Sequence, residues 1–302
     1  MRCGFVCLLG RPNAGKSTLL NMLVGEKLAI VTPKPQTTRT RVEGIVNLPA
    51  GEGRPAAQLV LVDTPGVHRS RSWLDRRMAQ EIRAALQECH LVLWIKDVTR
   101  GRGPEEEYVL SLVRKSEVPV FLLLNKIDLI PKPELLPIIE ACRQLHPFRE
   151  IIPISAKTHD GRSRLLDQIV NVLPEGEPHF PAERYTNLPV RYLAAEMIRE
   201  QVWRETAEEL PYSTAVEIER FVETPEITRI AAVIYCEREG QKGIIIGRGG
   251  QMLKKIGAAA RRQIEKMLAA HVFLELFVKV EPQWRERRDF VERLFDGFSL
   301  RR

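Results

Sequence analysis

The first residues that could do chemistry form a phosphate-binding loop near the amino terminus. Its sequence, GRPNAGKS, matches the pattern GxxxxGK[ST] and lies between an apolar run and a helical pattern. Glycines let the backbone fold around phosphates with several N–H groups pointing inward, and the following helix adds the positive end of its dipole. We expect Lys16 to reach the β- and γ-phosphates and the Ser17 hydroxyl to bind Mg²⁺. The loop predicts a nucleotide site made by Gly10, Arg11, Pro12, Asn13, Ala14, Gly15, Lys16, Ser17 and Thr18.

A second reactive segment, Asp63-Thr64-Pro65-Gly66, follows an apolar run at 57–63. An acidic residue at the end of a strand can hold Mg²⁺ through water, and the Gly66 amide can approach a γ-phosphate. On its own, DTPG is equally compatible with a simple turn. Its position after the phosphate loop favours the nucleotide-site interpretation, with Asp63, Thr64, Pro65 and Gly66 as nucleotide-binding residues.

The third and fourth segments indicate recognition of a base. NKID follows the apolar run 119–124, and SAK follows 150–154. The carboxylate of Asp128 can accept hydrogen bonds from the ring N–H and the exocyclic amine of guanine, whereas adenine presents an acceptor at one of those places. NKxD alone is also an ordinary helix start, with Asn as the cap. Four such segments in this order, each after a strand, predict a guanine site that includes Asn125, Lys126, Asp128, Ser155, Ala156 and Lys157.

The residues expected to act in hydrolysis come from three of these loops. The segment 32–40 is expected to be a mobile switch, in which Thr38 is the better candidate for sensing Mg²⁺ and the γ-phosphate and Thr37 the alternative. A capped polar loop is the other interpretation of this segment. The predicted catalytic residues are Lys16, Thr38 and Gly66, and the predicted metal ligands are Ser17, Thr38 and Asp63.

One position limits the predicted rate of hydrolysis. Val67 stands where many GTPases carry a glutamine that orients the attacking water, and valine cannot position water by hydrogen bonding. We therefore expect slow intrinsic hydrolysis. Asn13 resembles the residue that some GTPases use to hold a monovalent cation beside the phosphates. A K⁺ ion there could supply the charge that an arginine finger supplies elsewhere, a factor of about 10³–10⁵ in rate. Arg39 and Arg41 could act as an internal finger, although solvated loop arginines are the favoured interpretation.

The elements that position these loops follow from hydrophobic patterning. Apolar runs alternate with helical patterns, which predicts a mainly parallel α/β sheet covered on both faces, as in a P-loop GTPase domain. Turn residues at 49–55 predict that one edge strand is antiparallel. The expected strands are 3–10, 41–48, 57–63, 91–97, 119–124 and 150–154. The expected helices are 16–24, 74–87, 104–116, 134–145 and 162–173. Lys96 lies on an otherwise apolar strand, where a charged side chain is unexpected.

Composition indicates a globular protein of two domains. The chain has 302 residues, of which 44% are hydrophobic and 28% charged, and no apolar run reaches the ~20 residues of a membrane-spanning helix. No secretory signal is recognisable, so we expect a cytoplasmic protein. Five cysteines without a CxxC pair are expected to be reduced and packed. The net charge of +7 is a weak indication of an anionic partner. The predicted domains are 1–173 and 189–302, joined by a proline-rich linker at 174–188.

The second domain carries a possible RNA-binding element. GxxG at 247–250 lies between an apolar run and a long basic helix (250–270), and six basic residues with no acid lie between 241 and 264. Together with the expected strands 213–222, 227–237 and 272–280, this pattern fits a smaller α+β KH-type domain, whose groove clamps single-stranded RNA. A solvated basic helix or a protein-docking face is the alternative. The predicted RNA-binding residues are Lys242, Ile244, Ile246, Gly247, Arg248, Gly249, Gly250, Lys254, Lys255, Arg261 and Arg262. Phe273 and Phe277 are expected in the core, and Trp284 is expected to anchor a last helix at 284–295.

Both halves together resemble the Era family of bacterial GTPases. The motifs GRPNAGKS, PQTTR, DTPG and NKID are followed in order by YLAAEMIREQV, KGIIIGRGGQMLKKIGAAARRQIE and VFLELFVKVEPQWR. The resemblance covers both domains and implies a GTP/GDP- and Mg²⁺-dependent factor for assembly of the small ribosomal subunit. It also implies that the KH groove binds the 3′ end of 16S rRNA and that GTP favours the RNA-competent state. Family members have been associated with the inner face of the membrane, which nothing in this sequence requires. The expected oligomeric state is a monomer.

Overall fold

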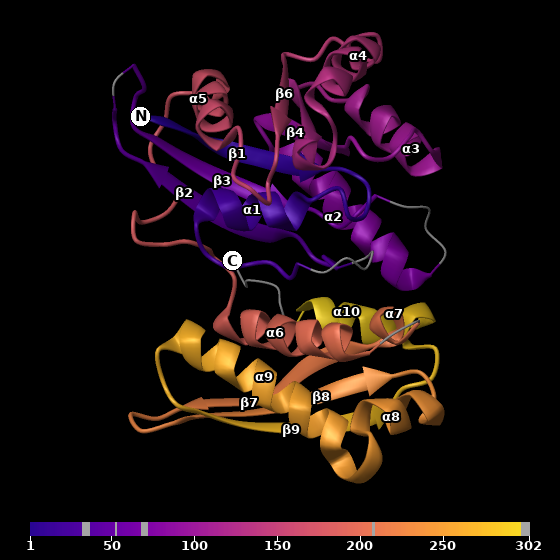
Figure 1. Cartoon of the computed structure of the whole chain (residues 1–302). Coiled ribbons are helices and arrows are strands. Elements are labelled where there is room, and N and C mark those ends of the chain that lie inside the picture. Colours follow the sequence, from indigo (N-terminus) through magenta and orange to yellow (C-terminus); the bar gives the residue numbers. More distant parts are fainter. Residues whose placement is uncertain (32–36, 52, 68–71, 207–208, 297–302) are drawn as a thin grey trace. The chain divides into compact units, whose positions relative to one another are not determined.

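The structure is a computed structural model that describes residues 1–31, 37–51, 53–67, 72–206 and 209–296. It divides into two compact units, one of residues 1–70 and 75–187 and the other of residues 71–74 and 188–302 (Figure 1). Among the described residues, no helix combines the length and the apolar character that crossing a bilayer requires.

The first unit is built on a six-stranded sheet. Its strands lie in the order β2-β3-β1-β4-β5-β6, and every neighbouring pair is parallel except the antiparallel pair of β2 and β3. The antiparallel edge strand is therefore confirmed. The strands are β1 (Arg2–Leu9), β2 (Val42–Leu48), β3 (Ala57–Asp63), β4 (Leu91–Asp97), β5 (Val120–Asn125) and β6 (Glu150–Ile154).

Helices cover both faces of this sheet. The helices are α1 (Lys16–Val24), α2 (Trp73–Glu88), α3 (Pro104–Val113), α4 (Lys132–Arg143) and α5 (Arg162–Val172). Residues of α2, α3 and α4 share one apolar core with one face of the strands, while α1 packs on β2 and β3. β3, β4 and β5 are buried at every position, as expected for parallel strands covered on both sides. The carboxyl ends of β1, β3, β4, β5 and β6 consequently meet at one edge, where open α/β sheets bind ligands.

The proline-rich segment 174–187 packs on β2 and β3. The Ile45 amide donates to the Tyr185 carbonyl at 2.8 Å, and the Gln58 side chain exchanges hydrogen bonds with the backbone of Phe180 at 2.7 and 3.0 Å. Although its composition predicts a linker, this segment has fixed contacts with the first unit up to Asn187.

The second unit is a three-stranded sheet with helices. Its strands lie in the order β7-β8-β9, with β7 and β8 antiparallel and β8 and β9 parallel. A helix that the sequence pattern did not set apart, α8, precedes the GxxG turn. The elements are α6 (Val190–Glu205), α7 (Leu210–Ser213), β7 (Ala215–Glu223), β8 (Thr228–Cys236), α8 (Glu239–Ile246), α9 (Gln251–Leu268), β9 (Val272–Val280) and α10 (Arg288–Asp296).

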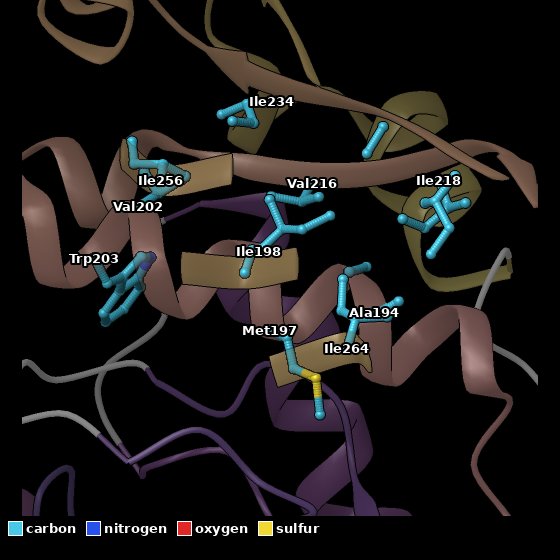
Figure 2. Close-up of a cluster of buried hydrophobic side chains, with 14 of the residues drawn as sticks. Ala194, Met197, Ile198, Val202, Trp203, Val216, Ile218, Ile234, Ile256 and Ile264 are labelled. Atoms are coloured by element: carbon cyan, nitrogen blue, oxygen red, sulfur yellow. The ribbon is translucent and has the colours of Figure 1, made fainter. Parts of the chain in front are cut away.

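The core of this unit lies between one sheet face and the helices α6 and α9. Ile198 of α6, Ile234 of β8 and Ile256 of α9 are fully buried in it (Figure 2). The other sheet face contacts α10 near the carboxyl end of β8, where the ring centroids of Tyr235 and Phe290 are 5.0 Å apart. Trp284 packs on Phe290 and donates from its indole nitrogen to the Ser213 carbonyl at 2.8 Å, so it anchors the last helix as predicted.

The expectation that Phe273 and Phe277 belong to the core is wrong. β9 is an edge strand, and the two rings project from the sheet face opposite the core, with 44% and 50% of their surface exposed. The inward-facing residues of this strand, Leu274 and Leu276, pack against the core instead. Alternation along a strand shows which residues share a face, but not whether that face is covered.

Candidate functional site

The phosphate loop runs from the end of β1 into α1, as its sequence predicts. Gly15 has φ 102°, and a Cβ atom there would lie 2.2 Å from the Asn125 side-chain nitrogen, so only glycine fits. The ammonium of Lys16 is buried and donates to the carbonyls of Gly10 and Arg11 at 3.1 and 3.2 Å. Burial lowers the pKa of Lys16, against the opposing effect of the nearby Asp63 carboxylate.

Three oxygen-bearing side chains, from the start of α1, the end of β3 and the loop before β2, meet beside Lys16. The Ser17 hydroxyl lies 2.7 Å from Oδ2 of Asp63 and 2.9 Å from the Thr38 hydroxyl, which itself donates to the same Oδ2 at 3.1 Å. Burial raises the pKa of Asp63, opposed by Lys16 and by these two hydroxyls. The other oxygen of Asp63, Oδ1, is buried without a hydrogen-bond partner. A hard cation would satisfy this oxygen, so the donor set fits Mg²⁺.

Thr38, rather than Thr37, is the threonine that joins this cluster. Both threonines line the pocket in front of the phosphate loop. Residues 32–36 of the predicted switch segment lie outside the described residues. The favoured interpretation of Arg39 and Arg41 as solvated loop arginines is wrong. Arg39 is buried, and Arg41 is bound at 2.7 Å by Glu88.

The DTPG segment is fastened to the phosphate loop. The Thr64 hydroxyl donates to the Leu8 carbonyl at 2.7 Å, and the Val67 amide donates to the Gly10 carbonyl at 3.2 Å. A Cβ atom on Gly66 would lie 2.9 Å from Cα of Pro12, so the close approach of the two loops requires glycine. The Val67 side chain is fully buried in the core between sheet and helices, so it does not reach the pocket. Residues 68–71, which follow directly, lie outside the described residues.

The two predicted base-recognition loops are joined to each other and to the phosphate loop. The Asn125 side chain donates to the Ala14 carbonyl at 2.8 Å and accepts from the Ala156 amide at 3.0 Å. The Ser155 hydroxyl donates to Oδ1 of Asp128 at 2.6 Å. The Asp128 carboxylate is exposed, as is Lys157.

A pocket of about 360 Å³ lies in front of these loops. Sequence reasoning missed Ile30, Val31 and Arg100 among its lining residues, because none belongs to a recognisable motif. The lining residues that the sequence did predict are Pro12, Asn13, Gly15, Lys16, Ser17, Thr18, Thr38, Gly66 and Lys126.

The GxxG turn of the second unit connects α8 to α9. Gly247 has φ 72°, and a Cβ atom there would lie 2.7 Å from Cβ of Met252, whereas the space around Gly250 is open. Arg248 and Gly249 between them are exposed. The turn thus exposes backbone at the start of the basic helix, where a sugar-phosphate chain could approach closely.

A groove of about 500 Å³ runs from this turn between α9 and β9. Of the predicted RNA-binding residues, Gly250, Lys254 and Arg261 line it. Lys255 does not, because it forms an ion pair at 2.5 Å with Glu205 of α6. Ile244, Lys242, Ile246 and Arg262 lie outside the lining, and Ile244 is 55% exposed. The lining residues that sequence reasoning missed are Leu253, Gly257, Ala258, Phe273, Leu274 and Leu276.

Small residues on α9 keep this groove open. A Cβ atom on Gly257 would lie 3.2 Å from the Leu276 side chain across the groove. The groove could have been predicted from the run Gly257-Ala258 between two pairs of basic residues, because small residues on a helix face leave room for a ligand.

Comparison with known proteins agrees with both halves of this description. Residues 5–126 match the family of 50S ribosome-binding GTPases, and residues 209–285 match the KH domain. GTPase Era of Geobacter metallireducens is 47% identical over 295 residues, covering 97% of both chains. GTPase Era of Heliobacterium modesticaldum is 43% identical, covering 96% of this chain and 95% of the relative.

Two solved structures share the arrangement over almost the full length. A variant of Aquifex aeolicus Era bound to GDP and AlF4⁻ has a TM-score of 0.92 and 41% identity, covering 98% of this chain and 99% of its own. A structure of Era in complex with MgGDPNP and nucleotides 1506–1542 of 16S ribosomal RNA has a TM-score of 0.93, with the same identity and coverage. With this likeness in sequence, fold and motif geometry, the chain belongs to the Era family of GTPases.

Proposed function

We propose that this GTPase is a molecular switch that binds the single-stranded 3′ end of 16S rRNA through its KH groove during assembly of the small ribosomal subunit. The observation that carries the proposal is the presence of both sites in one chain, a Ser17–Thr38–Asp63 cluster beside the phosphate loop and a basic groove at a GxxG turn. A relative 41% identical to this chain holds MgGDPNP and an rRNA fragment together.

In the proposed nucleotide site, the backbone of the loop from Gly10 to Thr18 receives the phosphates, and Asp128 accepts from guanine. Ser17, Thr38 and Asp63 hold Mg²⁺, which neutralises charge on the β- and γ-phosphates. Lys16 carries a second positive charge to the same phosphates once its ammonium leaves the loop carbonyls. Thr38 couples the presence of the γ-phosphate to the position of the switch segment. The Gly66 amide donates a hydrogen bond to the γ-phosphate.

The proposed hydrolysis is slow without a helper, since the Val67 side chain is packed in the core and presents no group to water. Asn13, in the pocket with φ 62°, is the residue we propose to hold K⁺ beside the phosphates. Replacing K⁺ by Na⁺ should slow hydrolysis by the wild-type protein and leave an Asn13→Ala variant unaffected. Equal wild-type rates in the two salts would remove K⁺ from the mechanism.

The proposed coupling between the sites runs through the switch segment and the segment before the KH domain. Five residues after Thr38, Glu43 accepts through its carbonyl from the Thr186 hydroxyl at 2.5 Å, and its carboxylate accepts from the Asn187 side chain. Displacement of Thr38 would thus act on the residues that immediately precede the second unit. A ligand shifts such an equilibrium only by its differential affinity for the two states.

The proposed RNA site is the groove between α9 and β9, with Lys254 and Arg261 meeting phosphates and the apolar floor meeting bases. We place the protein in the cytoplasm, where its ribosomal substrate is. Contact with the inner face of the membrane is the lesser alternative, because α9 carries no aromatic residue to insert into lipid.

The rate of GTP hydrolysis with and without a short oligonucleotide from the 3′ end of 16S rRNA tests the proposal. We expect stimulation by this sequence and none by a scrambled one of equal length. A rate that is the same in all three conditions would contradict the coupling, and displacement of the RNA by anionic vesicles would favour the membrane alternative.

A further inference from the structure

A cluster of charged side chains adjoins the nucleotide pocket, and three of its members, Lys96, Asp97 and Glu106, have no role in the steps above. It joins the phosphate loop, β4, α3 and the NKID loop through Arg11, Lys96, Asp97, Glu106 and Lys126. The first four are buried, with at most 8% of their surface exposed. Buried ion pairs contribute little stability relative to apolar packing, so a cluster of this size suggests a requirement other than stability.

One half of the cluster explains Lys96. Its ammonium lies 2.9 Å from Oε1 of Glu106 on α3, and the second oxygen of Glu106 lies 3.9 Å from Nε of Arg11. The Nε and Nη2 atoms of Arg11 are buried without hydrogen bonds. Glu106 thus supplies negative charge between an arginine of the phosphate loop and a strand lysine.

Asp97 forms the other half, and its two oxygens have different partners. Oδ1 accepts from the amide and the hydroxyl of Thr99 at 3.0 and 2.6 Å, which fixes the carboxylate to the loop after β4. Oδ2 accepts from the ammonium of Lys126 at 2.7 Å and lies 3.9 Å from Nη2 of Arg11. Burial alone would raise the pKa of Asp97, but the hydrogen bonds from Lys126 and Thr99 outweigh it and hold that pKa below its usual value.

The strand register makes this contact possible. Asp97 pairs with Asn125 across β4 and β5, so the carboxylate lies beside the first residue of the NKID loop. Lys126 has φ 71°, a left-handed conformation that a non-glycine residue keeps only where its surroundings hold it. Its side chain lines the nucleotide pocket while its ammonium remains on Asp97.

We propose that Asp97 is a positioning residue for guanine recognition. By holding the ammonium of Lys126, it keeps the aliphatic stem of that lysine along the face where the base binds. This inference depends on the proposed guanine site and deepens it. Asp97 acts through Lys126 and on the base, so its loss raises the dissociation rates of GDP and GTP by the same factor.

A double-mutant cycle on the full-length protein tests this dependence. Dissociation of fluorescent methylanthraniloyl-GDP is measured for the wild type, D97N, K126M and the D97N/K126M double variant. We expect D97N to accelerate dissociation about 10- to 100-fold, the range for losing a charged hydrogen bond. In the K126M background the same substitution should change the rate by less than about twofold, because the partner it acts through is absent.

Two further variants keep the test independent of folding. E106Q makes the same carboxylate-to-amide change in the cluster without touching Lys126, and it should leave GDP dissociation within about threefold of wild type. T99V removes only the hydroxyl that fixes Oδ1, on an exposed residue, and should accelerate dissociation in the same direction as D97N but less. If D97N cannot be purified in folded form, the T99V/K126M cycle replaces it.

The outcomes separate this inference from the proposed function. A D97N effect of equal size in the K126M background, or none in the wild-type background, would overturn the positioning role while the wild-type protein still bound GDP. A wild-type protein that bound no guanine nucleotide would instead overturn the nucleotide site itself.

Discussion

Replacing Asp128 by Asn should convert the base preference of this GTPase from guanine to xanthine. The Ser155 hydroxyl donates to Oδ1 of Asp128 at 2.6 Å, and an asparagine oxygen can accept the same hydrogen bond, so the loop should keep its shape. What changes is the second oxygen of the side chain, which becomes an NH₂ donor opposite the exocyclic amine of guanine, while the remaining oxygen can still accept from the ring N–H. Xanthine has a carbonyl oxygen in place of the exocyclic amine and can accept from the new amide.

The size of the effect follows from the two hydrogen bonds to a charged acceptor. Each is worth about 1.5–3 kcal/mol. Asparagine loses one of them and the charge that strengthens the other, so the cost is at most about 3–6 kcal/mol, or about 10²–10⁴-fold in GDP affinity. In the free protein the Asp128 carboxylate is exposed, so the wild type must desolvate it on binding the base, which offsets part of the hydrogen-bond energy. We therefore expect the loss of GDP affinity to lie in the lower half of this range.

The assay is competition of labelled GDP by unlabelled GDP, XDP and ADP at saturating Mg²⁺. Asp160 on the neighbouring loop offers a matched control, because its contact with Ser155 is made by its backbone carbonyl, and D160N should leave all three affinities unchanged. A D128N protein that still preferred GDP to XDP would refute the assignment of the base-recognition residue.

Three further predictions concern the metal, the turn and the groove. T38A removes one of three oxygens from the proposed metal cluster and should raise the Mg²⁺ concentration for half-maximal hydrolysis at least about tenfold. A magnesium titration of the GTPase rate measures this midpoint, and an unchanged midpoint would exclude Thr38 as a ligand. G250D places a carboxylate where the groove begins, and like-charge repulsion should weaken RNA binding about 100-fold or more. The control G240D, also in open space but on α8, should not weaken it, and equal losses in both variants would argue against the GxxG turn as the contact. K254A should weaken RNA binding and reduce the slope of log affinity against log salt by about 1. K255A should have the smaller effect, because the Lys255 ammonium is paired with Glu205. The reverse order of effects would contradict the assignment of this groove as the RNA site.

Sequence reasoning predicted the parts of the site that are encoded locally. Each nucleotide motif follows an apolar strand, and parallel strands bring their carboxyl ends to one edge, so the meeting of Asp63 with Ser17 followed from topology alone. The choice between Thr37 and Thr38 needed coordinates, because adjacent residues point in different directions, and the structure shows the Thr38 hydroxyl donating to Asp63.

The errors concern contacts between distant elements. Lys96 is explained by Glu106 on the next helix, and Lys255 is withdrawn from the groove by Glu205 on α6. Neither partner can be identified from spacing along the chain, since each depends on how helices pack against the strands. An apolar strand pattern predicts Phe273 and Phe277 in the core, yet β9 lies at the edge of a sheet that is only partly covered on one face, and both rings are on that face.

The equilibrium affinity of the full-length protein for the 16S rRNA 3′-end oligonucleotide, measured with a non-hydrolysable GTP analogue and again with GDP, tests the central claim most directly. Coupling energies between two sites are typically about 1–3 kcal/mol, so we predict RNA binding at least about fivefold tighter with the analogue. Equal affinities in the two nucleotide states would contradict the account of this protein as a switch, even if each site bound its own ligand.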